Sequence, residues 1–331
     1  MKDVAIVAPC HIQPSKAWVE ALHRESASAD VIIVDDSDGK ITLPGCLEMF
    51  GYARQKQELG DELYAMFERF HKSSACKQFG LWLAYKRGYK KVIVIDSDCI
   101  VPERFVELHS SLLESGGTAC GGWGNPLAGT YLYSRGYPYS QRNWKMGAHM
   151  GLWTNELDLY GTDRVGKKDL PKTPDEKYYN QYVRTAAFFP LSGMNVSFNR
   201  EVIPFMLFLP NFKSDKGEKF SRHDDIWGGY IFQKLMQKKH YALSYGKPFV
   251  FHDTVVVPRE DAKEERAMIK YEDDFFYFID SMLDLRPQLK EATAQQVFEY
   301  LADTSKLSPG YAIFKDLLPA FALQAKLYAD V

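Results

Sequence analysis

The sequence predicts an α/β fold in which a mostly parallel sheet is flanked by helices, with a helical extension at the C-terminus. Over the first hundred residues, short apolar runs typical of buried strands alternate with amphipathic helical stretches. This alternation is the pattern of a parallel sheet with crossover helices. After Pro258 the sequence changes to long amphipathic segments. We therefore divide the chain into a domain at 1–258 and an extension at 259–331.

The elements of the first part can be placed in order. Strands are expected at residues 4–9 (VAIVAP), 31–39 (VIIVDDSDG) and 92–96 (VIVID). Between them, one helix opens at Pro14, and a second has apolar residues at helical spacing and stops at Gly88. Ligands bind at the carboxyl ends of strands in such sheets. The residues at these strand ends, among them Pro9 and Asp36, are therefore candidates for a binding site.

The second half of the chain is less regular. Between residues 116 and 200, Gly, Tyr, Pro and Asn are dense, so we expect loops and short strands over one edge of the sheet. A helix is expected to begin near Asp224, and two short strands in HYALSY and PFVFHD. The extension then opens with a long amphipathic helix that Pro287 closes, and two further helical stretches follow.

The composition is that of an ordinary soluble protein and excludes several classes. The 331 residues are 46% hydrophobic and 25% charged, and a net charge of −2 gives no electrostatic reason to bind nucleic acid or an anionic membrane. The longest apolar stretch is broken by Pro204 and is shorter than the ~20 residues of a membrane span. The N-terminus lacks a signal peptide pattern. Five dispersed cysteines without a CxxC pair favour neither disulfides nor zinc, so we expect a reduced, cytoplasmic protein.

Asp96 and Asp98 follow the third strand directly, in the sequence DSD. In an extended backbone, positions i and i+2 point to the same face, and two carboxylates on one side suit Mg²⁺ or Mn²⁺. A polar turn explains the same residues, since Asp and Ser are common in turns. His252, at the end of a later strand, could complete an oxygen-rich Mn²⁺ site or be a partly buried histidine with ordinary hydrogen bonds.

Two further segments have both a functional and a structural explanation. Asp224 and Asp225 precede an apolar helix, where they could cap its N-terminus or hold sugar hydroxyls. Gly193 and Asn195 lie in the strand-like run LSGMNVSFNR. The glycine there marks either a ligand that approaches the backbone closely or a β-bulge. The aromatic content of 14% suits a sugar- or base-binding site and a large core equally.

Seven segments occur in the chain in this order: HKSSACKQFG, VIVIDSDC, RGYPYSQR, GLWTNELD, GMNVSFNRE, RHDDIWGGY and GKPFVFHD. Together they resemble the reversibly glycosylated polypeptides, also known as UDP-arabinopyranose mutases, over roughly three quarters of the chain. The resemblance implies a Rossmann-type fold similar to that of GT-A glycosyltransferases, a UDP-sugar substrate and Mn²⁺ or Mg²⁺ as cofactor. Plant members of this family interconvert the pyranose and furanose forms of UDP-arabinose and become glycosylated on an arginine.

The resemblance also implies site residues. Asp96 and Asp98 look like the acids that bind the metal and the diphosphate. Lys72 matches the helix that precedes their strand, and Arg135 and Arg142 fall in the block that holds the glycosylated arginine. A guanidinium has no free lone pair for attack and is suited to grip phosphate. We therefore favour Arg142 as a site residue, and covalent glycosylation is implied by the resemblance alone.

These residues lead to a hypothesis for the reaction. UDP lies across the carboxyl ends of the first strands with Asp36 near the uridine, and the DSD acids and His252 hold Mn²⁺ against the diphosphate. Departure of UDP leaves an oxocarbenium-like sugar beside Asp224 or Asp225. Bound UDP then attacks again after the ring has rearranged, as a mutase requires.

Two alternatives remain open. A glycosyltransferase with the same donor site would move the sugar to a glycan, lipid or protein acceptor and would need a base to activate the acceptor hydroxyl. A non-catalytic nucleotide-sugar-binding or scaffolding protein would keep the fold without the chemistry, although the retained acids and His252 argue against it. A second copy of the chain is a further candidate partner, because the aromatic faces of the extension could pack on the core or on another molecule.

Overall fold

A computed structural model of the chain describes residues 2–45, 47–115, 135–136, 138–142, 144–178, 182–185, 188–284 and 286–329. Its strands are β1 (Val4–Cys10), β2 (Asp30–Asp35), β3 (Glu48–Phe50), β4 (Lys91–Ile95), β5 (Cys99–Ile100), β6 (Lys145–Asn155), β7 (Tyr182–Thr185), β8 (Asn195–Asn199), β9 (Phe212–Lys213), β10 (Lys219–Phe220) and β11 (Tyr241–His252). Its α-helices are α1 (Lys16–Glu25), α2 (Tyr52–Phe67), α3 (Lys77–Lys86), α4 (Phe105–Glu114), α5 (Gly161–Arg164), α6 (Asp224–Lys239), α7 (Pro258–Glu264), α8 (Arg266–Leu283), α9 (Ala294–Ala302) and α10 (Leu318–Leu327).

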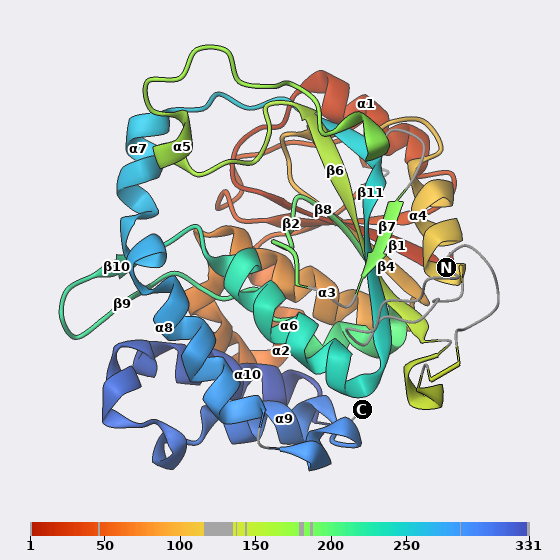
Figure 1. The fold of residues 1–331 in the computed structure, drawn as a ribbon. Coiled ribbons are helices and arrows are strands. Elements are labelled where there is room, and N and C mark those ends of the chain that lie inside the picture. Colours follow the sequence, from red (N-terminus) through yellow and green to blue (C-terminus); the bar gives the residue numbers. More distant parts are fainter. Residues whose placement is uncertain are drawn as a thin grey trace.

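Most strands of the large sheet run in one direction, which confirms the predicted α/β class (Figure 1). Within the described part of the chain, the order is β3-β2-β1-β4-β8-β6-β11-β5, with β7 paired to β11. The pairs β2–β3, β1–β2, β1–β4 and β6–β11 are parallel, and β8 runs antiparallel between β4 and β6. The carboxyl ends of β4, β6 and β11 therefore meet at one edge of the sheet, where ligands of such folds bind.

Helices cover both faces of the sheet, because alternate residues of each central strand point to opposite sides. Ile6 and Ile93 pack toward α1 and α4 on one side, whereas Val7 and Val94 face α2, α3 and α6 on the other. Helix α3 lies so close to β1 that a Cβ at Gly80 would fall 2.3 Å from Val7 Cγ1, which explains the glycine. This close approach fixes where the N-terminus of α3 meets the strand ends.

The C-terminal extension packs into the same hydrophobic core as the sheet. Phe275 of α8, Phe298 of α9 and Phe321 of α10 belong to the buried cluster that also contains the α3 side of the sheet. Trp82 of α3 donates from Nε1 to the carbonyl of Leu327 at 3.1 Å. The boundary at residue 258 therefore separates segments that share one core. Among the described helices, none is both long enough and apolar enough to cross a membrane.

The prediction of loops and short strands for residues 116–200 was wrong for β6, whereas the described segment between β6 and β7 is largely irregular and β7 and β8 are short strands. β6 is an eleven-residue strand in the interior of the sheet, not a short strand over its edge. The sequence of β6 does not look like that of a strand because it contains glycines where neighbouring side chains leave no space for a Cβ. A Cβ at Gly151 would lie 2.2 Å from Asn195 Nδ2. The two short strands expected in HYALSY and PFVFHD are one strand, β11, with an irregular register between Gly246 and Val250. Helices α2 and α4 were not predicted.

Candidate active site

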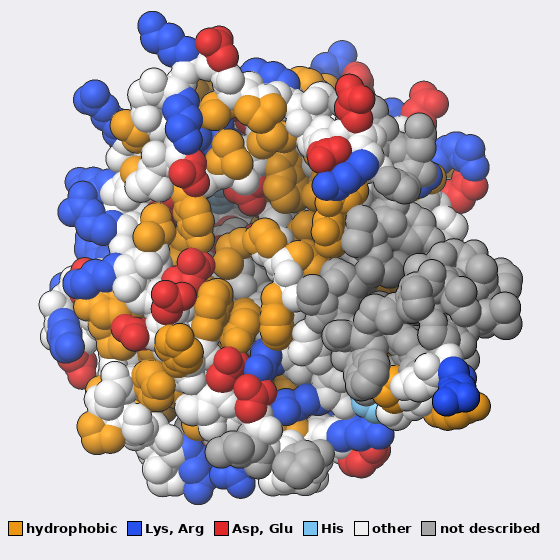
Figure 2. All heavy atoms as spheres, in the orientation of Figure 1, with side chains coloured by type: hydrophobic (Ala, Val, Ile, Leu, Met, Phe, Trp, Pro, Cys, Tyr) orange, Lys and Arg blue, Asp and Glu red, His pale blue; other side chains and the backbone are white. Residues whose placement is uncertain are grey.

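A cavity of about 870 Å³ opens at the edge of the sheet where β4, β6 and β11 end. Its walls come from the segment after β4, the loop that leads from β6 into α5, the first turn of α6, the end of β11, and the facing sides of α7 and α8. The face of the molecule drawn in Figure 2 carries hydrophobic and acidic side chains around this hollow. The extension therefore supplies one wall of the cavity.

Asp96 and Asp98 both reach the cavity, but they have different partners. Asp96 Oδ1 lies 2.9 Å from Nζ of Lys77, whereas Asp98 Oδ2 lies 3.4 Å from Nε2 of His252. His252 is placed there by the sheet, because β5 pairs with β11 in a register that puts His252 opposite Cys99. Asp96, Asp98 and His252, which were predicted as metal ligands, thus all line the cavity, and Asp98 and His252 form the close pair.

The Asp98–His252 pair has the chemistry of a metal site. Nδ1 of His252 donates to the carbonyl of Glu156 at 2.6 Å, since a carbonyl only accepts, and this leaves Nε2 as the nitrogen that faces Asp98. A hydrogen bond to the distal nitrogen is the usual way in which proteins orient a ligating histidine. Although burial opposes it, the hydrogen bond from His252 holds the pKa of Asp98 below its usual range.

A divalent cation at this point would still need further donors. In the described chain, no group of three or more His, Cys, Asp or Glu side chains is arranged to hold a metal ion. Asp96 is engaged by Lys77, so the protein contributes an oxygen and a nitrogen donor from Asp98 and His252. These two residues would hold Mn²⁺ or Mg²⁺ only together with oxygen donors from a bound ligand or from water.

Lys77 is a buried cation that contacts an acid of the cavity, Asp96, and it was not among the predicted site residues. Its side chain is 1% exposed, and Nζ contacts Asp96 at 2.9 Å and the carbonyl of Gly193 at 3.5 Å. Although burial disfavours its charge, attraction from Asp96, Asp224 and Asp225 raises the pKa of Lys77. A lysine is almost never buried without a charged partner, so the burial of Lys77, which only the structure shows, indicates its role.

Asp224 and Asp225 form the first turn of α6 and face Lys77. Asp224 Oδ2 accepts from the hydroxyl of Ser74 at 2.5 Å, and Asp225 Oδ2 accepts from the N–H of Gly193 at 2.7 Å. Burial and the neighbouring Asp224 raise the pKa of Asp225 to about 6. Both acids line the cavity from the first turn of α6, but the N-cap of this helix is His223, so neither aspartate is the capping residue of the structural explanation.

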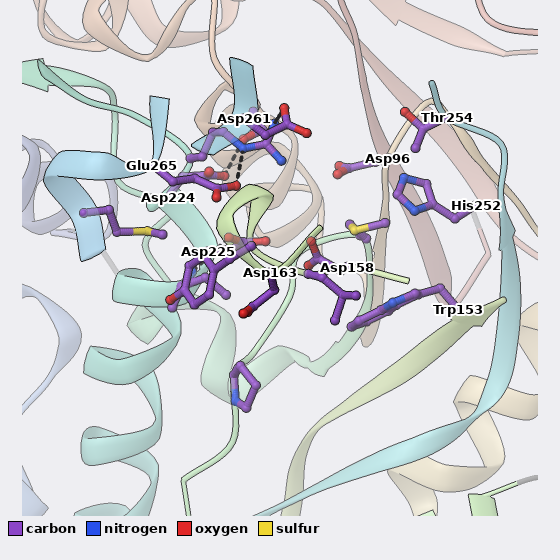
Figure 3. A pocket seen from close by; sticks show the side chains of 18 of the residues that line it. Asp96, Trp153, Asp158, Asp163, Asp224, Asp225, His252, Thr254, Asp261 and Glu265 are labelled. Atoms are coloured by element: carbon purple, nitrogen blue, oxygen red, sulfur yellow. Dashed lines mark hydrogen bonds and ion pairs between the residues drawn. The ribbon is translucent and has the colours of Figure 1, made fainter. Parts of the chain in front are cut away.

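Two more aspartates that the sequence analysis did not select lie in the same cavity. Asp158 and Asp163 come from the loop after β6 and from α5, and Figure 3 shows them with Asp225 in the middle of the cavity. Burial away from water and the negative charge of Asp225 raise the pKa of Asp158. The GLWTNELD segment contains Asp158, but nothing in its local pattern distinguishes this aspartate from a surface acid.

Pro9, Asp36 and Lys72 do not line this cavity. Pro9 and Asp36 lie at the carboxyl ends of the adjacent strands β1 and β2. The carboxylate of Asp36 accepts from the hydroxyl of Tyr52 at 2.9 Å and from the backbone N–H groups of Lys72 and Ser73. These three predicted residues thus form a neighbouring group at the same edge of the sheet, next to Asp96.

Gly193 and Asn195 have structural explanations. A Cβ at Gly193 would lie 2.7 Å from a ring carbon of Phe208 and 2.9 Å from Nζ of Lys77, so protein packing requires this glycine. Asn195 is fully buried and donates to two carbonyls, those of Leu152 and Pro248, while its oxygen pairs with His109. The amide of Asn195 therefore has no donor left for a ligand, and the structure does not place it in the cavity.

Arg135 and Arg142 are not brought to the cavity either. Arg142 precedes β6 at Lys145, and the cavity lies beyond the other end of that strand at Asn155. An eleven-residue strand spans roughly 35 Å. Arg142 instead lies 3.9 Å over the ring of Tyr139, and Arg135 lies in an exposed turn. The sequence motif is present, but the fold separates it from the acids.

The family model described as "Reversibly glycosylated polypeptide" matches residues 1–329 of the chain. "UDP-arabinopyranose mutase 1" of Arabidopsis thaliana is 30% identical over 267 residues, which cover 75% of this chain and 71% of that protein. "UDP-arabinopyranose mutase 1" of Oryza sativa subsp. japonica is 28% identical over 267 residues, covering 75% and 70%.

"Probable UDP-arabinopyranose mutase 1" of Zea mays is 29% identical over 229 residues, or 64% of this chain. The chain spans 59% of the maize protein's length, which is less than two thirds. The matched family model extends through the C-terminal helices that form a wall of the cavity, so the extension is part of what this chain shares with its relatives.

Proposed function

The chain belongs to the reversibly glycosylated polypeptide family, and from this premise we propose that it is a metal-dependent UDP-sugar mutase that interconverts pyranose and furanose forms of UDP-arabinose. One observation carries the proposal. The Asp98–His252 pair, suited to a divalent cation, shares a single cavity with the acids at the start of α6. A leaving diphosphate and a reacting sugar need these two groups side by side.

The strand ends suggest how the donor lies. UDP would extend across the carboxyl ends of β1 and β2, with Asp36 toward the uridine, and its diphosphate would reach Asp98 and His252. The sugar would then enter the acidic cavity. A divalent cation held by Asp98 and His252 would neutralise the charge that develops on the leaving diphosphate.

The protein's own residues would act on the sugar. The bond between the anomeric carbon and the β-phosphate oxygen breaks, and its electron pair leaves with UDP. Positive charge then develops at the anomeric carbon, where the carboxylates of Asp158 and Asp225 would stabilise it, while Asp224 would orient a hydroxyl. The charge of Lys77 lowers the pKa of Asp224 and of Asp225, against the burial that raises both. The oxygen of the sugar's 4-hydroxyl would then bond to the anomeric carbon and lose its proton to a carboxylate of the cavity. The bond between the anomeric carbon and the ring oxygen O5 would break as O5 takes up a proton, and a β-phosphate oxygen of the bound UDP would form the new bond to the anomeric carbon.

Incubation with UDP-arabinopyranose and Mn²⁺ should yield UDP-arabinofuranose without any added acceptor. The two forms are separated by chromatography, and a panel of other UDP-sugars defines the sugar preference. Removing the cation with a chelator should stop the conversion, and adding Mn²⁺ back should restore it. Binding of UDP-sugars without any turnover would contradict the mutase and support the non-catalytic alternative.

Turnover should fall as the pH drops through about 6. Asp225 must be ionised to stabilise positive charge, and its pKa is raised to about 6 by burial and by Asp224, against the attraction of Lys77 from α3. Asp158, from the loop after β6, also faces it and carries the same sign of charge. Below about pH 6 the protonated, inactive form dominates, so the rate should drop about tenfold for each further unit.

The matched variant for this pH profile is Asp225→Asn, which has no proton to lose. It should show low activity without the acid limb near pH 6. Retention of the same limb in this variant would assign the titration to another group.

Self-glycosylation of Arg142 is not part of this proposal. Within one chain, β6 separates Arg142 from the acids and from the Asp98–His252 pair. An arginine at that distance cannot receive the sugar directly from the donor held in the cavity.

A further inference from the structure

The cavity is much larger than the sugar that the proposed reaction places in it. Its volume is about 870 Å³, which at about 30 Å³ for each water-sized group has room for roughly thirty such groups. A pentosyl group has about nine non-hydrogen atoms, and a phosphate with its cation adds a few more. Roughly half of the cavity therefore stays open when a sugar is bound.

One wall of the cavity is aromatic and could border the volume that the sugar leaves empty. This aromatic wall is formed by Phe188, Tyr230 and Phe276. They come from the segment before β8, from α6 and from α8. The ring centroids of Tyr230 and Phe276 are 4.1 Å apart, and those of Phe188 and Tyr230 are 5.0 Å apart. The hydroxyl of Tyr230 donates to Asp280 at 2.7 Å, which fixes the ring in place. The wall is thus a preformed apolar surface.

Away from the cation that the Asp98–His252 pair would hold, the charges around the cavity disfavour an anionic ligand. Nine described carboxylate side chains line it, against two arginines. Arg222 is paired with Glu265 at 3.0 Å and with Asp261 at 3.4 Å, and Arg164 is paired with Glu156. Among the described lining residues, neither arginine is left to bind a phosphate, a sulfate or a uronic acid. The ligand of this side must therefore be neutral or positively charged.

We propose that the aromatic wall is a subsite for a neutral saccharide that accepts the sugar from the UDP-sugar. Neutral sugars combine apolar C–H faces, which stack on aromatic rings, with hydroxyl donors that carboxylates accept. Asp163 and Glu272 also line the cavity, and Glu272 lies one helical turn before Phe276 on α8, so their carboxylates are possible acceptors for these hydroxyls. The proposal rests on the proposed UDP-sugar donor and extends it to a second reaction.

The bond between the anomeric carbon and the β-phosphate oxygen breaks, and UDP leaves with the electron pair. The oxygen of a saccharide hydroxyl forms the new bond to the anomeric carbon. The proton of that hydroxyl passes to the carboxylate of Asp225, which releases it to solvent. The cavity would thus serve both reactions with the same donor site, and the presence of a saccharide would select transfer.

Binding of the neutral disaccharides xylobiose and cellobiose tests the subsite directly by NMR titration, with and without UDP and Mn²⁺. Phe276→Ala should weaken binding about tenfold, because it removes one stacking ring, and Phe276→Tyr should restore it. Tyr277→Ala is the matched control: this neighbour on α8 is 65% exposed and does not line the cavity. A disaccharide of galacturonic acid should not bind.

Mass spectrometry then tests transfer. With UDP-arabinose, Mn²⁺ and cellobiose, the expected product is the disaccharide plus one pentosyl group. Absence of disaccharide binding, or equal binding by Phe276→Ala, overturns the subsite even if UDP-arabinose is still interconverted. Binding without a transfer product overturns the acceptor role. Loss of all UDP-sugar conversion with disaccharide binding intact contradicts the proposed function instead. Should Phe276→Ala fail to fold, Phe188→Ala makes the same test at an exposed ring.

Discussion

Replacing Lys77 with methionine should lower the free energy of unfolding by about 3–5 kcal/mol, the usual cost of removing one partner from a buried ion pair. The Lys77 side chain is 1% exposed, and it offsets the charges of Asp96, Asp224 and Asp225. Methionine keeps much of the chain's volume but leaves these acids without their cation. A denaturant titration of the two proteins measures the difference.

Neutralising Asp96, the acid that contacts Lys77, provides the control for this prediction. The double variant Lys77→Met/Asp96→Asn should recover a large part of the lost stability, because a buried charge is no longer left unpaired. A coupling free energy near zero in this double-mutant cycle would show that the two groups do not interact in solution. The positive charge of Lys77 lowers the pKa of Asp225. In Lys77→Met this pKa should rise, so the acid limb of the activity profile should also move to higher pH.

Replacing Asp98 with asparagine should reduce mutase turnover at least about a hundredfold and weaken Mn²⁺ binding about tenfold to a hundredfold. Asparagine keeps the shape but loses the negative charge that Asp98 presents beside Nε2 of His252. The Asp98 side chain is 39% exposed, so the fold should survive. Calorimetry with Mn²⁺ and UDP measures the affinity, and circular dichroism checks the fold.

Two other variants sharpen the assignment of the metal site. Asp253→Asn changes the next residue after His252, an exposed aspartate that does not line the cavity, and should leave Mn²⁺ binding unchanged. Asp96→Asn should weaken Mn²⁺ binding less than Asp98→Asn, because Oδ1 of Asp96 is held by Lys77. Equal losses from both acids would make Asp96 a direct ligand, as the sequence analysis predicted, and would contradict the two-donor site.

Several residues of the site could be identified before the structure because they follow strands or open a helix. Asp98, His252, Asp224 and Asp225 occupy such positions, and they meet in one cavity. Lys77 escaped notice, since a lysine inside an apolar helical run looks like a surface residue until its burial is known. Its importance depends on three acids that are distant in sequence.

The positions of Arg142 and of β6 also differ from the prediction, because they too depend on contacts between residues that are distant in the sequence. Arg142 belongs to a recognisable motif, yet β6 is a long interior strand and carries the motif to the end of the sheet opposite the acids. β6 itself was hidden by glycines such as Gly151, whose small size is required by contact with Asn195. Local pattern cannot show contacts made by residues from another strand.

The sequence by itself determined the α/β class, the carboxyl-end position of the acids and the family, because strand and helix periodicity and the order of the motifs are properties of the chain. Only the tertiary structure decided which acids share Lys77, which of them faces His252, and that α8 contributes Phe276 to an aromatic wall of the cavity. The physical reason is that these contacts depend on sheet register and helix packing, which join residues separated by up to two hundred positions.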